Sequence, residues 1–252
     1  MTLIATAISR YGIVQAADPN LTSYPDRFVA GQRIFRLDFL NATLAITGGY
    51  AVAGVPLDQW TIAAIDDYKR KAKRASLKGL VDQLRIGLTR EGNPRHRRVI
   101  HAAGYVRDEK RRFHPEVYYL RNIRGRTPDG GYGRAGREFT LSEEFWSLDY
   151  SRTETQDTLR EGGFRMYLDG FPERRIAYML LHLRIHDFYQ QVWQSSKVFR
   201  RPRSLDDIAA LVDLDMRVAA AFLASAEHGS RRGVDSLEVE VIPAPAGSLK
   251  LS

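Results

Sequence analysis

Thr2 is the first residue of this sequence whose type and position suggest chemistry. Removal of Met1, which the small side chain of Thr2 permits, would leave an α-amine beside the hydroxyl of the same residue. A threonine hydroxyl is a weak nucleophile, and pairing with an N-terminal amine is one known way to activate it. An α-amine has a pKa of about 7.7–8.0, so near pH 7 a useful fraction is neutral and can accept a proton. Thr2 is therefore a candidate nucleophile.

The segment around Thr2 is predicted to be a β-hairpin. Residues 2–10 and 11–18 are short runs of strand-forming and small residues, separated by Tyr11 and Gly12. A glycine at such a position supplies the backbone conformation that a tight turn requires. Chain termini fray unless they are tied into structure, so an apolar first strand would hold the N-terminal residue in a fixed place.

Several residues beyond Thr2 extend this pattern. They are Gly12, the run AAD that ends at Asp18, Thr22, the segment GQRIFRL at 31–37, and Gly48 within AITGG. Together they resemble the opening of proteasome β-type subunits of the bacterial type, which are N-terminal-nucleophile (Ntn) hydrolases. The resemblance runs without a gap from Thr2 through Thr22. It implies a threonine-type peptidase that acts on amide bonds.

The same resemblance implies a role for each matched residue. Thr2 would be the nucleophile, Asp18 the carboxylate of the catalytic group, and Gly48 the backbone donor to the oxyanion. Thr22 would line the substrate cleft. Arg33 stands at the position of the catalytic lysine of the family. The resemblance implies no cofactor and no metal.

Arg33 leaves two interpretations open. A guanidinium is always charged and cannot shuttle a proton. It can lower the pKa of a nearby α-amine by like-charge repulsion, which favours retained activity. It can instead pair with Asp18 as a structural salt bridge, in a catalytically inactive scaffold or assembly protein of the same fold. The supporting serine and aspartate of the family are not recognisable near 227–230, which agrees with the second interpretation.

The elements that must position these residues follow from hydrophobic periodicity and turn residues. Strands are predicted at 33–37, 41–47, 98–106, 115–123 and 237–242, and helices from Pro56 to about 74, at 76–88, at 171–193 and at 204–226. Ser204 is predicted to cap the last helix, with Asp207 at the reciprocal position. Residues 19–31 are predicted to be a loop. Residues 124–170 are predicted to be an irregular glycine-rich segment or insertion, with a helix-like island near 142–150.

This order of elements predicts a single α+β domain over residues 1–252. The resemblance adds a specific architecture, the four-layer αββα sandwich of the Ntn hydrolases. It also implies a peptide or protein as substrate, a homo-oligomer that closes into a ring in related proteins, and an unidentified unfoldase as a further partner. Trp193 and Phe199 are candidate contact residues of such an oligomer.

The amino-acid composition narrows the classes of protein to which this chain could belong. The chain has 252 residues, 44% hydrophobic, with no cysteine, so disulfides and cysteine-based metal sites are excluded. It has no signal-like or membrane-spanning run, which predicts a cytoplasmic protein with no membrane partner. The net charge is +8, but the basic clusters suit helix ends and solvated loops better than nucleic acid. His182 and His186 share a helix face, yet no third ligand accompanies them, so no metal site is predicted.

Overall fold

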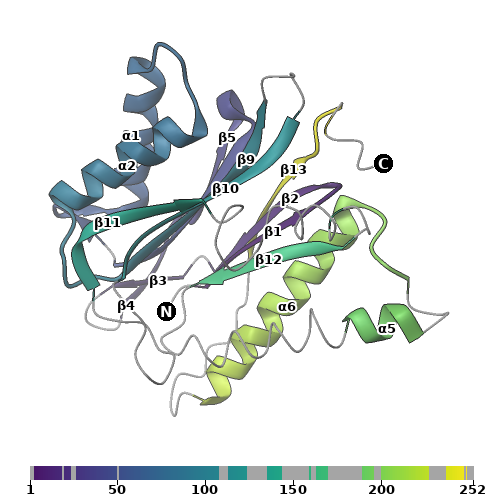
Figure 1. Ribbon diagram of the computed structural model, residues 1–252. Helices are drawn as coiled ribbons and strands as arrows, with labels where there is room; N and C mark the ends of the chain where they lie inside the picture. Colours follow the sequence, from purple (N-terminus) through teal and green to yellow (C-terminus); the bar gives the residue numbers. More distant parts are fainter. Residues whose placement is uncertain are drawn as a thin grey trace.

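The computed structural model describes residues 3–18, 20–23, 27–49, 51–107, 113–123, 135–143, 159, 163–169, 189–195, 200–226, 237–246 and 248. Over these residues the chain is a sheet-rich α+β fold (Figure 1). The strands are β1 Ile4–Ser9, β2 Gly12–Ala17, β3 Asn20–Ser23, β4 Arg27–Ala30, β5 Ile34–Leu37, β6 Ala42–Gly48, β7 Ala51–Val52, β8 Val55–Pro56, β9 Arg98–Arg107, β10 Phe113–Ile123, β11 Ala135–Glu143, β12 Phe164–Asp169 and β13 Glu238–Pro243. The helices are α1 Leu57–Lys71, α2 Leu77–Glu91, α5 Gln190–Ser195 and α6 Leu205–Ala226, with a 3-10 turn η1 at Asp38–Leu40.

Two antiparallel sheets form the body of the fold. One has four strands in the order β12-β1-β2-β13, and the other has five in the order β11-β10-β9-β6-β5. Two small hairpins, β3-β4 and β7-β8, are separate from them. Every residue of β1 and β2 is buried, which explains why both strands are near-continuous runs of apolar and small residues. The predicted N-terminal hairpin is confirmed over these two strands.

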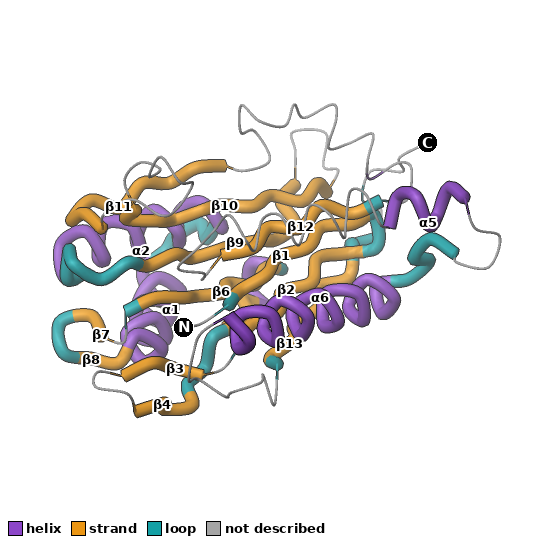
Figure 2. Tube along the Cα trace, turned by 90° about the horizontal axis from the view of Figure 1, so that it is seen from below, coloured by secondary structure: helices purple, strands orange, loops and turns teal. Residues whose placement is uncertain are grey.

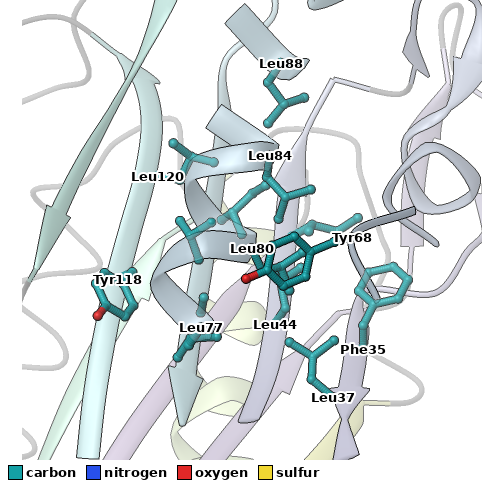
Figure 3. Packing of buried hydrophobic residues seen from close by; sticks show 14 of the residues in the cluster. Phe35, Leu37, Leu44, Tyr68, Leu77, Leu80, Leu84, Leu88, Tyr118 and Leu120 are labelled. Atoms are coloured by element: carbon teal, nitrogen blue, oxygen red, sulfur yellow. The ribbon is translucent and has the colours of Figure 1, made fainter. Parts of the chain in front are cut away.

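Helices α1 and α2 cover one face of the five-stranded sheet. In Figure 3 the leucines of α2 lie over Leu44 of β6 and Leu120 of β10. Leu80, Leu84 and Leu88 recur at intervals of one helical turn and are fully buried. The helix begins after Ser76, whose hydroxyl accepts a hydrogen bond from the backbone N–H of Gly79 at 3.1 Å.

Helix α6 packs on the four-stranded sheet, and Figure 2 shows it running alongside the strands of that sheet. Its buried face, with Ile208, Val212 and Met216, meets small residues of β1 and β2. The predicted cap is confirmed: the backbone N–H of Asp207 donates to the Ser204 hydroxyl at 3.1 Å, and that of Ser204 donates to the Asp207 carboxylate at 3.0 Å.

The two sheets face each other through a third apolar cluster. Ile8, Ile13 and Ile242 of the four-stranded sheet meet Val99 and Tyr119 of the five-stranded sheet. Side chains alternate between the two faces of a strand. In β1 the even-numbered positions therefore point toward the other sheet and the odd-numbered ones toward α6.

The predicted four-layer αββα sandwich is wrong as a description of this chain. The described residues form sheets of unequal size and two extra hairpins, with the pair α1 and α2 over one sheet and α6 over the other. The predicted helix 171–193 is described only from 189 onward. Strand content also exceeds the prediction, because residues 124–170 supply β11 and β12.

Two local predictions are corrected as well. The predicted loop at 19–31 contains the β3-β4 hairpin, so its turn residues connect two short strands. The helix-like island at 142–150 begins inside β11, and its remainder lies outside the described residues. In both places pairing with a distant or neighbouring strand overrides weak local preferences. Among the described residues, no helix is both long and apolar enough to cross a membrane.

Candidate functional site

The start of β1 lies directly beside the end of β2. The backbone N–H of Asp18 donates a hydrogen bond to the carbonyl of Leu3 at 2.9 Å, which continues the β1-β2 ladder by one step. Both residues are buried. Thr2, the predicted nucleophile, lies outside the described residues. Leu3, to which Thr2 is covalently bonded, is thus fixed next to Asp18, the predicted carboxylate.

Arg33 precedes β5 and is completely buried. Its backbone carbonyl accepts a hydrogen bond from the N–H of Ile46 at 2.9 Å, which ties it to β6. Burial lowers the pKa of the Arg33 guanidinium to about 10, while the negative charges of Asp18, Asp58 and Glu238 oppose that shift. Arg33 is therefore cationic at neutral pH, and Asp18 is the carboxylate whose charge acts on it most strongly.

A small apolar cluster explains why these residues converge. Ile4, Ala17, Ile34 and Ala45 pack together between the two sheets. Each of them is the immediate neighbour in sequence of a residue at the site, namely Leu3, Asp18, Arg33 and Ile46. The cluster therefore brings the start of β1, the end of β2, the start of β5 and the middle of β6 to one place.

Gly48 ends β6, two residues after Ile46. Its φ of +111° is one that residues with side chains rarely adopt. A Cβ at this position would lie 2.0 Å from the carbonyl oxygen of Arg97, so the close approach of β6 and β9 also requires glycine. The structure thus gives Gly48 a structural reason to be glycine at the edge of the candidate site.

Thr22 is placed only through its backbone, which pairs with Phe28 in the β3-β4 hairpin. The structure does not describe its side chain. His182, His186, Phe199 and 227–230 lie outside the described residues, as does the side chain of Trp193. Over the positions that the structure describes, no group of three or more potential ligands is placed to hold a metal ion.

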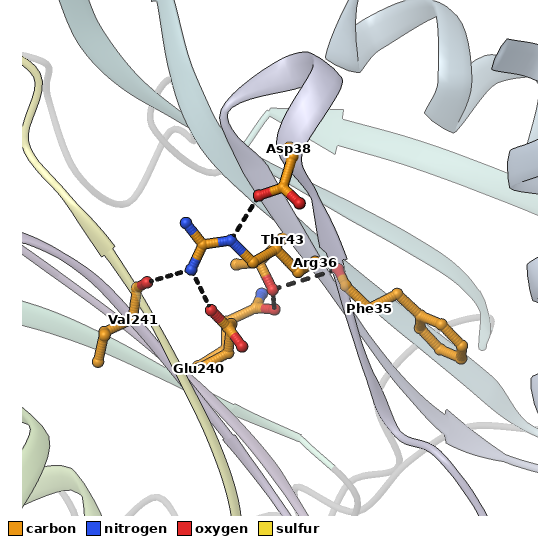
Figure 4. A network of polar contacts seen from close by, with 7 residues as sticks. Phe35, Arg36, Asp38, Thr43, Glu240 and Val241 are labelled. Carbon is orange, nitrogen blue, oxygen red and sulfur yellow. Dashed lines mark hydrogen bonds and ion pairs between the residues drawn. The ribbon is translucent and has the colours of Figure 1, made fainter.

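Glu238, which the sequence analysis did not single out, fixes Arg33 from the other sheet. One of its carboxylate oxygens, Oε2, accepts hydrogen bonds from the backbone N–H groups of Arg33 and Ile34, both at 2.9 Å. Two residues further along β13, Glu240 accepts a hydrogen bond from the side chain of Arg36 (Figure 4). These contacts join the edge strand of one sheet to the edge strand of the other.

A second unpredicted feature is a chain of buried polar side chains that crosses between the sheets. The Thr43 hydroxyl donates to Gln15 Oε1 at 3.0 Å, and Gln15 Nε2 donates to the Thr6 hydroxyl at 3.0 Å. Thr6 Oγ1 lies 3.1 Å from His101 Nδ1, and His101 Nε2 lies 3.0 Å from Asp169 Oδ2. All five side chains are buried.

Asp169 brings this chain to the candidate site. It is the last residue of β12, and in the β1-β12 ladder it lies opposite Ile4. The start of β1 is therefore flanked by Asp18 on one side and by Asp169 on the other. One sequence signal was available: polar residues occupy inward positions of otherwise apolar strands, and such residues must find partners.

Comparisons with known proteins find remote structural likenesses but no match by sequence. No family model and no curated protein matches the sequence. The fold is similar to Anbu, an ancestral β-subunit, from Yersinia bercovieri, with a TM-score of 0.48 and 11% identity over 96% of this chain and 82% of that chain. It is also similar to a mutant of Anbu from Hyphomicrobium sp. strain MC1, with a TM-score of 0.49 and 11% identity over 100% of this chain and 90% of that chain.

These results correct the family predicted from the sequence. The chain is not identified as a proteasome β-type subunit of the bacterial type, because no model of that or any other family matches it. The two solved structures named above are ancestral β-subunits, and each is 11% identical to this chain.

Proposed function

We propose that this chain is an N-terminal threonine hydrolase that cleaves amide bonds once Met1 has been removed. The observation that supports this most directly is the placement of Leu3: the residue that follows the proposed nucleophile is hydrogen-bonded to Asp18, beside a buried cation, Arg33. Preorganised charges around a nucleophile in a water-poor site are a main source of catalysis.

In the proposed reaction, the hydroxyl oxygen of Thr2 attacks the carbonyl carbon of the scissile amide. The α-amine of Thr2 takes the hydroxyl proton and then gives it to the leaving amine, which leaves an ester on Thr2. Water activated by the same amine hydrolyses that ester and regenerates the hydroxyl. The backbone N–H of Gly48 would donate to the oxyanion, and Thr22 would line the cleft.

Arg33 is assigned an electrostatic role in this proposal. It is cationic at neutral pH and cannot accept the proton, so the α-amine must be the base. Its charge would lower the pKa of that amine and keep more of it neutral at pH 7. Asp18 would hold the guanidinium in place.

Full-length protein provides the test. N-terminal sequencing and intact mass determine whether Thr2 is exposed. A peptide epoxyketone, which condenses with both the amine and the hydroxyl of an N-terminal threonine, then reports on the pair by mass, and a fluorogenic peptide reports on turnover. Thr2→Ala is expected to abolish both signals. Hydrolysis that persists in Thr2→Ala would contradict the mechanism.

Arg33→Lys is the informative second variant, and Arg36→Lys is its matched control. Arg36 lies in β5, close to Arg33 in the sequence, but its side chain is 45% exposed. We expect Arg33→Lys to change the rate of peptide hydrolysis. Arg36→Lys should leave that rate within about twofold of the wild-type value, since exposed charge pairs have small effects. Equal rates in wild type, Arg33→Lys and Arg36→Lys would remove Arg33 from the proposal.

A non-catalytic scaffold is the second candidate function. The complete burial of Arg33 among carboxylates favours it, because a guanidinium held in this way serves as a structural ion pair. Under this proposal Thr2 forms no adduct and the chain acts through assembly. Light scattering of wild-type protein tests the proposed homo-oligomer, and a monomer at working concentration would contradict both the oligomer and a ring. A cytoplasmic location, a protein substrate and an unfoldase partner remain predictions.

A further inference from the structure

We propose that Asp169, held in place by His101, is a positioning carboxylate for the N-terminal amine at the start of β1. This inference rests on the proposed function, since it assigns a role at the same site. It goes beyond that function because neither Asp169 nor His101 belongs to the residues that the sequence resemblance implies.

The first argument is position. Asp169 lies opposite Ile4 in the β1-β12 ladder, on the face of the sheet that turns toward the other sheet. Alternation along β1 places its even-numbered positions on that same face. The Asp169 carboxylate therefore lies on one side of the start of β1, and Asp18 lies on the other side.

The second argument is the direction of the hydrogen bonds. A carboxylate accepts only, so His101 Nε2 must carry a hydrogen and donate it to Asp169. In neutral His101, Nδ1 then accepts from the Thr6 hydroxyl, which in turn accepts from Gln15. Every donor in the chain from Thr43 to Asp169 thus points the same way, and the chain ends on the carboxylate.

The third argument is rigidity. His101 is completely buried and its ring packs against Tyr119, with the ring centroids 4.1 Å apart. Hydrogen bonds from two sides fix the orientation of the imidazole, and a fixed imidazole fixes Asp169. Positioning of this kind matters because a displacement of about 1 Å at a reacting group can cost about a hundredfold in rate.

Among the described residues, the charged groups near the start of β1 include Asp18, Asp169 and Arg33, and Asp58 and Glu238 act in turn on Arg33. Among the described residues, His101 contacts two titratable side chains, Asp169 by a hydrogen bond and Tyr119 by ring packing, and Tyr167 packs against Tyr119. Asp169 would oppose the effect of Arg33 on the amine. An opposite charge within about 4–6 Å favours the charged form of a group by about 1–3 pKa units.

The experiment measures the pKa of the Thr2 α-amine by NMR titration. Full-length protein starting at Thr2 is released from a cleavable N-terminal fusion, so the amine exists whether or not cells remove Met1. We expect Asp169→Asn to lower the pKa of the amine by about one unit. Thr43→Val cuts the far end of the same chain and is the matched control. It is expected to lower the unfolding midpoint and leave the pKa of the amine unchanged.

Kinetics supply a second readout. We expect His101→Phe, which keeps an aromatic ring against Tyr119, to lower kcat about tenfold or more with little change in KM. His101→Gln, which retains an N–H donor for Asp169, should recover part of that loss.

The inference is overturned if Asp169→Asn leaves the pKa of the amine unchanged, or if Thr43→Val lowers it equally. The first result would mean that the hydrogen-bonded side chains from Thr43 to Asp169 have a purely structural role. The second would indicate a general loosening of the fold. If the pKa falls as expected but wild-type protein hydrolyses no peptide, the positioning role stands and the proposed hydrolase function fails.

Discussion

Glu238 offers a sharp test of how the site is held together. Its single oxygen Oε2 accepts two backbone hydrogen bonds of 2.9 Å, from Arg33 and Ile34, and so joins β13 to the first residues of β5. Glu238→Ala removes the acceptor and leaves two buried N–H groups without it. Hydrogen bonds to a charged group contribute about 1.5 kcal/mol each at the lower end of their range, so we expect a loss of about 3 kcal/mol.

Glu240→Ala is the matched control, two residues along the same strand and facing the same edge. Its partner Arg36 is 45% exposed, so the pair should contribute at most about 1 kcal/mol. Glu238→Gln separates charge from acceptor geometry, because its amide oxygen can still accept both hydrogen bonds. We expect it to lose about half as much stability as Glu238→Ala.

Urea unfolding followed by far-UV circular dichroism measures these differences in the free energy of unfolding, and thermal unfolding measures the corresponding shifts in Tm. For a chain of this size, a change of 1 kcal/mol shifts Tm by about 2–4 °C, so Glu238→Ala should lower Tm by about 6–12 °C. The reasoning is refuted if Glu238→Ala costs no more than Glu240→Ala. That result would mean that the backbone of Arg33 does not depend on the opposite sheet.

Two further predictions concern the backbone at Gly48 and the start of α6. Gly48→Ala should be strongly destabilising in thermal unfolding, because its Cβ would lie 2.0 Å from a carbonyl oxygen. Gly54→Ala is the control: its φ is +82°, but no atom lies within 4 Å of the added carbon, so it should cost only the backbone strain of about 1 kcal/mol. Equal losses of stability in the two variants would argue against the clash at Gly48. Hydrogen bonds from the backbone N–H of Arg203 and from Ser204 lower the pKa of Asp207. The stability contributed by Asp207 is therefore present above about pH 4 and lost as the pH falls through the lowered pKa, so urea midpoints of wild type and Asp207→Asn should differ at pH 6 and converge toward pH 3.

Local features of the fold were predictable from the sequence. The cap formed by Ser204 and Asp207 involves residues three apart, and its hydrogen bonds are present. The hairpin of β1 and β2 was equally local, with Gly12 as the first residue of β2 directly after the turn. Such elements are encoded within a few residues, so propensity and turn chemistry are sufficient to identify them.

Contacts between distant residues were not predictable in this way. Strands β11 and β12 are paired with β10 and β1, which are distant in the sequence, and β11 itself carries a glycine and several polar residues that favour irregular structure. His101 is 68 positions from Asp169 and 95 from Thr6, and no periodicity in a single sequence relates them. The αββα prediction failed for the same reason, since it extended a resemblance in the first strands to layers that other segments must complete.

The charge of Arg33 links the two candidate functions to one measurable quantity. Burial of a guanidinium is unfavourable unless negative charges compensate it, and here Asp18, Asp58 and Glu238 do so only in part, since the pKa still falls to about 10. At neutral pH the cation therefore persists, and no residue other than the α-amine is available in this proposal to take the proton of Thr2. An active hydrolase needs that amine neutral, which Arg33 favours, while Asp18 and Asp169 favour its charged form. A pKa of the amine well below 8 would support hydrolysis, and one well above 8 would leave Arg33 as a structural cation and the chain as a scaffold.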